Sequence, residues 1–284
     1  MFTAKFKETL HMIQFEHTIF ALPFALISML DAAEGLPSAK IFFLILLSML
    51  FARSSAMAFN RYIDADIDLK NPRTNLRSIP AKRLSKIYVL NFTIISSAFF
   101  IITTYFINKL AFILSPIALL IIFTYSLTKR FTIFTHFILG LSLAIAPVGA
   151  WIAVRESISL PPILLGGFVL FWVAGFDIIY SCQDYKFDVA NRLYSFPQKY
   201  GIKNALLLTK IIHFIAFIFL TLFYFFGHFG IVFLIGVMFT AICLLYQNLI
   251  VKPNDLSKIN TAFFTTNGIS SILLLIFICI DLFI

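Results

Sequence analysis

Nine apolar segments, each about as long as a bilayer is thick, constrain this 284-residue chain more than any other feature. A helix needs about 20 apolar residues to cross the hydrocarbon core, and only helical bundles or closed barrels satisfy their backbone hydrogen bonds in lipid. Barrel strands alternate over short segments, whereas these runs are unbroken. The sequence therefore predicts an all-α, polytopic membrane protein, a bundle of nine transmembrane helices in a single domain over residues 1–284. The predicted segments are 13–33, 41–59, 87–107, 110–127, 134–153, 161–181, 204–226, 229–250 and 262–283.

The distribution of Lys and Arg predicts the orientation of these segments. Assigning the loops to alternate sides places 17 basic residues on one side and three, Lys40, Lys109 and Arg155, on the other. The positive-inside rule then predicts a cytoplasmic N-terminus and an external C-terminus. The net charge of +9 reflects this asymmetry. Because the basic residues are divided among separate loops, nucleic acid is excluded as a partner, and membrane lipid is expected around the bundle.

Acidic residues gather where the second apolar segment ends, in "FNRYIDADIDLKNPRTNLRSIP". On a helix, residues four apart lie on one face, so Asn60, Asp64 and Asp68 form one stripe, while Asp66 points elsewhere. The stripe is predicted at the cytoplasmic end of the segment.

A second acidic stripe follows the sixth segment, in "DIIYSCQDYKFDVANRLYSFPQKYG". Tyr180, Asp184 and Asp188 have the same spacing of four. The two segments run in the same direction across the membrane, so both stripes are expected on the cytoplasmic side. This correspondence is compatible with a weak parallel internal repeat.

Carboxylates gathered at a membrane edge repel one another unless a cation or basic groups join them. Mg²⁺ prefers oxygen ligands, whereas zinc would require His or Cys, and neither stripe contains them. Four basic residues on the same side are suited to meet phosphate oxygens: Arg73, Arg77, Lys129 and Arg130. The alternative is that these charges only cap helices and hold the protein at the interface.

With these motifs in order, the chain resembles the UbiA-type intramembrane aromatic prenyltransferases, in particular proteins similar to 4-hydroxybenzoate polyprenyltransferase. "NRYIDADID" resembles the first aspartate-rich motif of that family and "DYKFD" the second, and the loops "NPRTNLRSIP" and "YSLTKRFT" also match. Arg61 stands where many members carry an aspartate, and Lys186 lies where further acids are common. The opening "FEHTIFALPFAL" looks more like the branch associated with menaquinone made by the futalosine route.

The resemblance implies a magnesium-dependent transfer of a polyprenyl group from its diphosphate to a small aromatic acceptor, in ubiquinone or menaquinone biosynthesis. The acceptor is 4-hydroxybenzoate or 1,4-dihydroxy-6-naphthoate, and the location is a bacterial inner membrane. Mg²⁺ would be held by Asn60, Asp64, Asp68, Asp184 and Asp188, and the diphosphate by Arg73, Arg77 and Lys129.

Three further residues are candidates for catalysis. Asp177 is an intramembrane carboxylate and therefore a functional candidate by default; it would orient or deprotonate an acceptor hydroxyl, with Arg130 holding an acceptor carboxylate. Tyr180 is the best aromatic candidate for stabilising a cation. Alternatively, Asp177 only makes a hydrogen bond between helices, with Tyr180 or Arg53. The remaining polar residues of the segments are assigned to the interface (Glu16, His17, Arg53) or to packing (His136, His213, His228).

Two alternative functions remain open. A member of the same family could act on another acceptor, such as a haem, chlorophyll or sugar-phosphate precursor. A cation transporter could use carboxylate stripes along a pathway. The second alternative would require polar residues across the whole bilayer, and the outer halves of the two stripe-bearing segments are apolar.

Overall fold

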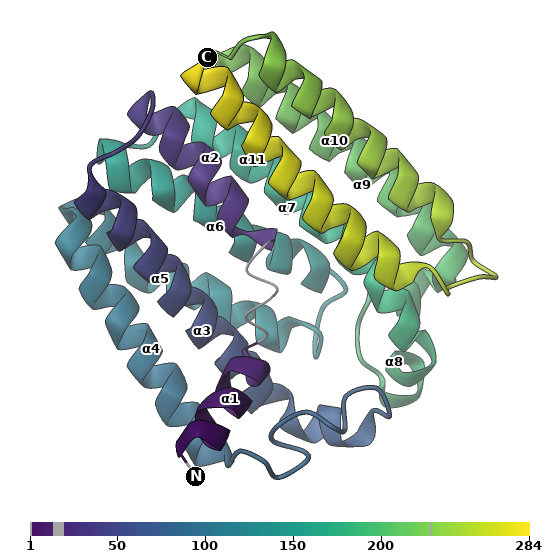
Figure 1. The fold of residues 1–284 in the computed structure, drawn as a ribbon. Coiled ribbons are helices and arrows are strands. Elements are labelled where there is room, and N and C mark those ends of the chain that lie inside the picture. The colour runs from purple at the N-terminus through teal and green to yellow at the C-terminus, as the bar shows by residue number, and fades with distance from the viewer. Residues whose placement is uncertain (1, 14–19, 228) are drawn as a thin grey trace. The chain divides into compact units, whose positions relative to one another are not determined.

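A computed structural model describes residues 2–13, 20–227 and 229–284 of the chain (Figure 1). Within these ranges the regular structure is helical, without β-strands beyond one isolated bridge, Lys252 to Asp255. Eight helical spans are long and apolar enough to cross a membrane, and α2 (Leu22–Ala33) is a shorter apolar helix. The predicted all-helical membrane fold is therefore confirmed, with the first predicted segment helical over its second half.

The chain divides into two compact units. Unit 1 comprises Met1–Thr18 and Ala39–Leu127, and unit 2 comprises Ile19–Ser38 and Thr128–Ile284. The helices of unit 1 are α1 (Phe2–Met12), α3 (Ala39–Lys70), α4 (Lys86–Ile107) and α5 (Lys109–Thr128). Unit 2 contains α2, α6 (Thr135–Arg155), α7 (Leu160–Ser181), α8 (Tyr185–Asn191), α9 (Phe196–Phe226), α10 (Ile231–Ile250) and α11 (Asn267–Phe283).

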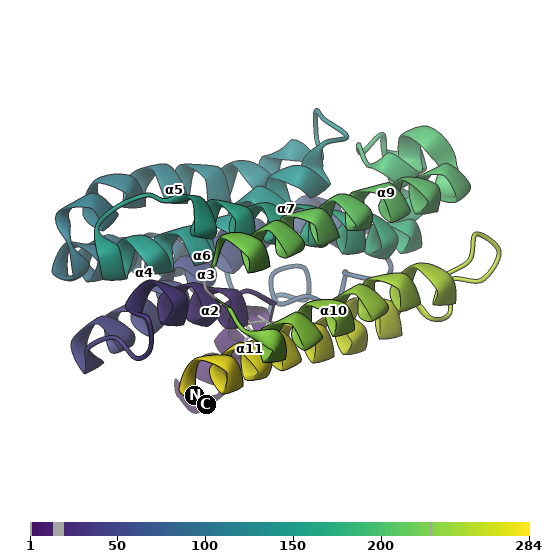
Figure 2. The ribbon, with the colours of Figure 1, turned by 90° about the horizontal axis from the view of Figure 1, so that it is seen from above.

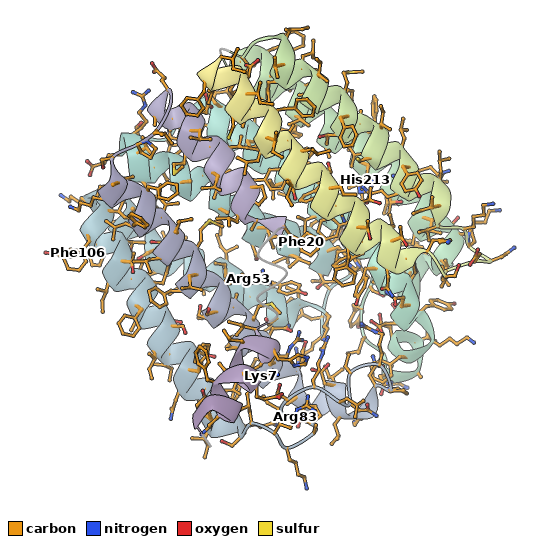
Figure 3. The ribbon with its side chains drawn as sticks, viewed as in Figure 1. Lys7, Phe20, Arg53, Arg83, Phe106 and His213 are labelled. Carbon is orange, nitrogen blue, oxygen red and sulfur yellow. The ribbon has the colours of Figure 1, made fainter. Side chains whose placement is uncertain are left out.

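In unit 1, α3 and α4 lie side by side as an antiparallel pair (Figure 1). Asn108 alone separates α4 from α5, and its side chain accepts a hydrogen bond from the backbone N–H of Ala111 at 2.8 Å. Apolar side chains on the outer faces, such as Phe106 of α4, point away from the unit, as expected for residues that face lipid (Figure 3).

The short helix α1 is bound to the loop between α3 and α4. The Glu8 carboxylate accepts hydrogen bonds from Ser78 Oγ at 2.5 Å and from Arg83 Nε at 2.8 Å. Figure 3 labels Lys7 on α1 and Arg83 in the loop before α4. A small cluster of buried residues, including Met12 and Val89, completes this end of unit 1.

The core of unit 2 surrounds α7. Phe168 and Trp172 on this helix are fully buried, and Phe24 of α2 packs edge-on against the Trp172 ring with centroids 4.9 Å apart. Helices α10 and α11 pack beside each other (Figure 2). The buried cluster that includes α7 also contains residues of α2, α6, α9, α10 and α11, which explains why α7 is apolar nearly all round.

Close helix contacts in unit 2 depend on glycine. A Cβ added to Gly140 of α6 would lie 2.2 Å from the backbone oxygen of Leu170 on α7. A Cβ on Gly175 of α7 would lie 2.2 Å from Nε2 of His213 on α9. In lipid, where helices gain little from hydrophobic association, small residues allow the van der Waals contact that holds a bundle together.

The sixth predicted segment does not continue as one α-helix through the second acidic stripe. Helix α7 ends at Ser181, a 3₁₀ turn η2 follows over Cys182–Asp184, and α8 begins at Tyr185. Arg192 closes α8 in the left-handed conformation at φ 53°. The expectation that Tyr180, Asp184 and Asp188 share one helical face was therefore wrong in detail, because a 3₁₀ turn has three residues per turn and shifts the phase.

Two features fix the C-terminal helix. A π-helical turn, η3 (Thr261–Thr266), precedes α11, and it places the ring of Phe263 against that of Tyr180, with centroids 4.1 Å apart. At the other end of α11, the Asp281 carboxylate accepts backbone N–H groups from Gly230, Val232 and Phe233, at 2.6, 3.1 and 3.1 Å, respectively. These donors are unpaired N–H groups at the start of α10, so the last helix caps its neighbour.

Candidate functional site

The first carboxylate group consists of Asp64 and Asp68 together with the amide of Asn60. It lies on α3 in unit 1. Helix α3 continues past the predicted end of its apolar segment to Lys70, so the predicted stripe is helical throughout. Asn60 Nδ2 donates to Asp64 Oδ2 at 3.1 Å and lies 3.4 Å from Ser126 Oγ of α5. Asp64 and Asp68 are 2% and 3% exposed, which for two carboxylates requires compensating charge.

Arg77 supplies part of that charge. Its Nη1 donates to Asp68 Oδ1 at 2.7 Å. The loop that returns Arg77 to the helix is shaped by Asn71, whose side chain accepts from the Arg73 backbone N–H at 3.0 Å, a local turn typical of Asn. Arg73 is exposed, and Arg77 is brought to Asp68 in the first carboxylate group.

Arg77 binds only one of the two carboxylate oxygens of Asp68. Oδ2 is buried and has no hydrogen-bond partner in the described part of the chain. A buried carboxylate oxygen of this kind is costly unless a cation, a water or a ligand meets it. Asp66, by contrast, is 82% exposed at its side chain and pairs with Lys86 at 2.8 Å, so it points away from the group, as the sequence predicts.

The second carboxylate group, Asp184 and Asp188, lies in unit 2 on η2 and α8. Asp188 accepts a hydrogen bond from Ser195 Oγ at 3.0 Å, and the same oxygen of Ser195 caps α9 by accepting from the Gln198 N–H at 3.3 Å. Asp188 also interacts electrostatically with Asp184 and with Lys129.

Backbone contacts hold Lys129 near this group. The Lys129 carbonyl accepts from the Tyr194 N–H at 2.8 Å, which ties the segment after α5 to the loop before α9. Arg130 is half-buried next to it, and Lys186 is exposed. Tyr180 is half-buried at the end of α7, and its ring packs against that of Phe263 at an interplanar angle of 33°. The structure thus groups Lys129 with Asp188, as expected for a basic loop beside the second motif.

Asp177 is paired with a residue that the sequence analysis assigned to packing. His136 Nδ1 on α6 lies 2.6 Å from Asp177 Oδ2 on α7. The sequence analysis assigned His136 to packing and considered Tyr180 and Arg53 as partners of Asp177. Within unit 2, the structure makes His136 a partner of that carboxylate. No spacing rule reveals the pair, since 41 residues separate the two.

The remaining polar residues that the sequence analysis assigned to the interface or to packing are not part of either carboxylate group. Glu16, His17 and His228 are outside the described residues. Arg53 is half-buried on α3. His213 (Figure 3) is buried on α9, with its Nδ1 2.6 Å from Asn248 Nδ2, in agreement with its assignment to packing.

The donor sets suit magnesium in part. Among the described residues, no three Asp, Glu, His or Cys side chains converge on one point. Each unit instead offers two carboxylates, and Mg²⁺ is commonly bound by one or two carboxylates together with waters and substrate phosphates. Asp68 Oδ2, which is buried without a hydrogen-bond partner in the described part of the chain, is a metal-ligand atom of this kind. The residues therefore fit a metal that arrives with an oxygen-rich ligand, and not a closed structural metal site.

Comparison with known proteins gives consistent results. Residues 21–269 match the UbiA prenyltransferase family. The chain is 28% identical to the 4-hydroxybenzoate octaprenyltransferase of Haemophilus ducreyi over 260 residues, which cover 88% of this chain and 90% of that protein. It is 31% identical over 178 residues to the mitochondrial 4-hydroxybenzoate polyprenyltransferase of Arabidopsis thaliana, and this match covers 62% of this chain and 43% of that protein.

Two solved structures are similar over nearly their whole length. A UbiA homolog from Aeropyrum pernix K1 has a TM-score of 0.86 at 29% identity, covering 94% of this chain and 98% of that chain. A UbiA homolog from Archaeoglobus fulgidus bound to DMAPP and Mg²⁺ has a TM-score of 0.78 at 20% identity, covering 95% and 97%. At this lower identity the likeness shows the shared fold.

Proposed function

Because the chain belongs to the UbiA prenyltransferase family, and is a multi-span membrane enzyme of prenyl transfer, we propose that it joins a polyprenyl group to a small aromatic acceptor in a Mg²⁺-dependent reaction. The observation that carries this proposal is the first carboxylate group, in which Asp68 is buried with one oxygen on Arg77 and, in the described part of the chain, no hydrogen-bond partner for the other. Such a group suits a metal–diphosphate complex better than it suits a structural ion pair.

In this proposal, Asn60, Asp64 and Asp68 of unit 1 and Asp184 and Asp188 of unit 2 hold Mg²⁺, and Arg73, Arg77 and Lys129 bind the diphosphate. Bound magnesium supplies positive charge to the leaving diphosphate. Arg77 and Lys129 add fixed positive charge where negative charge develops. The allylic carbon–oxygen bond breaks, and the diphosphate leaves with the electron pair.

The acceptor ring then attacks the allylic cation and loses a proton. We assign the orientation or deprotonation of the acceptor hydroxyl to Asp177, the binding of an acceptor carboxylate to Arg130, and the stabilisation of the cation to the ring of Tyr180. The Tyr180 ring is held in place by Phe263, which supports a fixed aromatic face. Water must be kept from the cation, and the apolar core of unit 2 suits that requirement.

The acceptor is 4-hydroxybenzoate or 1,4-dihydroxy-6-naphthoate. The printed names of the relatives favour the first, and the resemblance of "FEHTIFALPFAL" to the futalosine-route branch favours the second. The proposed location is a bacterial inner membrane, with a cytoplasmic N-terminus and an external C-terminus.

The test is product formation by the purified full-length protein. A labelled polyprenyl diphosphate and Mg²⁺ are supplied with each acceptor in parallel, and prenylated product is separated and identified. Asp64→Asn and Asp184→Asn are expected to lower product formation by about 100-fold or more, because each removes a charged metal ligand. Chelation of Mg²⁺ should have the same effect on the wild type.

Asp66→Asn is the matched control for the first group, since Asp66 lies on the same helix but is exposed and paired with Lys86. Asp255→Asn, in the exposed loop after α10, serves for the second. Both are expected to retain activity. Prenylated product that survives Asp64→Asn and Asp184→Asn would contradict the site, and cation uptake into vesicles without diphosphate consumption would favour a transporter instead.

A further inference from the structure

Arg61 is a buried cation within the first carboxylate group. It follows Asn60 on α3 and is 6% exposed. Its Nη1 donates to Asn60 Oδ1 at 3.2 Å. The Arg61 charge is attracted by Asp68 and Asp64 and repelled by Arg77. Residues three and seven positions apart lie on one helical face, so Arg61 faces both aspartates rather than the surrounding lipid.

The charges of this group already balance. Asp64 and Asp68 contribute two negative charges, and Arg61 and Arg77 contribute two positive charges. Because the aspartates and Arg61 are buried, their interactions are only weakly screened by water and salt. A divalent cation that enters alone would leave an uncompensated charge of two, whereas a cation that enters with a diphosphate would not.

We propose that Arg61 is a built-in cation of the diphosphate site, which weakens the binding of a divalent metal alone and strengthens the binding of the diphosphate alone. The first carboxylate group then accepts metal chiefly as part of a metal–diphosphate complex. This inference rests on the proposed function and adds a residue to it.

Arg61→Gln separates this role from a structural one, because its two effects have opposite signs. Mn²⁺ binding to the full-length protein in detergent is measured by electron paramagnetic resonance without diphosphate. The Asp64-dependent part is obtained by subtracting the signal of Asp64→Asn. We expect Arg61→Gln to tighten this Mn²⁺ binding by about tenfold or more. In the same variant, binding of an unreactive prenyl thiolodiphosphate in the presence of a chelator should weaken by about tenfold or more.

Arg61→Lys keeps the charge and is expected to stay within about threefold of the wild type in both measurements. Arg83→Gln is the matched control, because it removes a basic side chain of the same unit that binds Glu8, and it should change neither affinity. A loss of both affinities in Arg61→Gln, or no change in the Mn²⁺ affinity, would overturn the inference.

These outcomes are distinct from a failure of the proposed function. If the function fails, no variant binds the thiolodiphosphate and no prenylated product forms. If only the role of Arg61 is wrong, Asp64-dependent product still forms, while Arg61→Gln shows Mn²⁺ binding equal to or weaker than that of the wild type.

Discussion

His136 Nδ1 lies 2.6 Å from Asp177 Oδ2, and the same imidazole has its Nε2 3.5 Å from the backbone N–H of Phe196. The Phe196 N–H can only donate, so Nε2 offers its lone pair, and the proton of a neutral ring resides on Nδ1, from which it is donated to Asp177. His136 thus fixes one oxygen of an intramembrane carboxylate. Asp177 is 19% exposed at its side chain, which leaves a face for a ligand.

His136 is therefore expected to position Asp177 rather than to contact the prenyl donor. His136→Ala should lower kcat by roughly 10- to 100-fold, the range typical when a partner that orients a functional group is lost. The KM of the acceptor should rise, while that of the polyprenyl diphosphate stays unchanged. His136→Gln, which retains a donor, should recover part of the loss. An equal rise in both KM values would show that the histidine acts on the fold of unit 2 instead.

Gly140 is expected to be intolerant of substitution. Its missing Cβ leaves room for the Leu170 backbone oxygen, so Gly140→Ala must push α6 from α7 and should destabilise unit 2 by about 1–3 kcal/mol. Gly149 on the same helix has nothing within 4 Å of an added Cβ, and Gly149→Ala should be neutral or slightly stabilising. Thermal unfolding of the two variants in the same detergent checks this difference, and equal midpoints would contradict it.

Removing Asp281 should loosen the start of α10. Asp281→Ala leaves three backbone N–H groups without their acceptor, and the loss of such a cap costs about 1–2 kcal/mol. Asp281→Asn retains an acceptor oxygen and should cost less. Hydrogen exchange of the amides of residues 230–233, followed by mass spectrometry, should rise in Asp281→Ala. Unchanged exchange there would mean that the carboxylate is not needed to hold the helix end.

The attachment of α1 is expected to depend on pH. Burial raises the pKa of Glu8, but hydrogen bonds from Ser78 and Arg83 and the charges of Arg83 and His11 outweigh it, so that the pKa lies below its ordinary value. The ionised Glu8 carboxylate stabilises the docked helix at pH values above the ordinary glutamate pKa, near 4.3. This stabilisation is lost as the pH falls through the pKa of Glu8 in the folded protein. The helix should therefore be held at neutral pH and loosen as the pH falls through the lowered pKa of Glu8.

A spin label at Lys7→Cys, in a background without Cys279, reports on this attachment. Lys7 is exposed on α1, so the label should not disturb the Glu8 contacts. The wild-type background should show a less mobile label at neutral pH than at the acidic end of a pH titration that passes well below the ordinary pKa of a glutamate. Glu8→Gln should show the more mobile spectrum at both values, and a mobile label at pH 7 without that substitution would contradict the assignment.

The sequence predicted the helices well where composition alone decides. The helix bounds of α4, at Lys86 and Ile107, lie within a residue of the predicted segment 87–107. Composition failed where polar residues continue a helix. Helix α3 runs to Lys70, beyond the predicted limit of 59, because Asn60, Asp64 and Asp68 find partners within unit 1 and need not leave the helix.

Only those features of the candidate site that depend on residues close together in the sequence could be predicted from residue spacing. The first stripe lies on one helix, and Arg77 returns to Asp68 over nine residues. The pair of His136 and Asp177 was not predictable, because it depends on how α6 packs against α7. The burial of Arg61 was not predictable either, since an arginine at the end of an apolar segment ordinarily extends to the interface.

The π-helical turn η3 makes the C-terminal segment sensitive to residue count. The π turn accommodates one extra residue between two helical segments, so deleting one residue within 261–266 would restore ordinary α-helical geometry and change the directions of the side chains within the turn, while the segments on either side keep their relative orientation. Phe263 would then turn from Tyr180, while Asn267 and the rest of α11 kept their contacts. The loss of a single residue would in this way remove the ring of Phe263 from Tyr180 at the end of α7, so insertions and deletions here are a sharper probe of the enzyme than most substitutions.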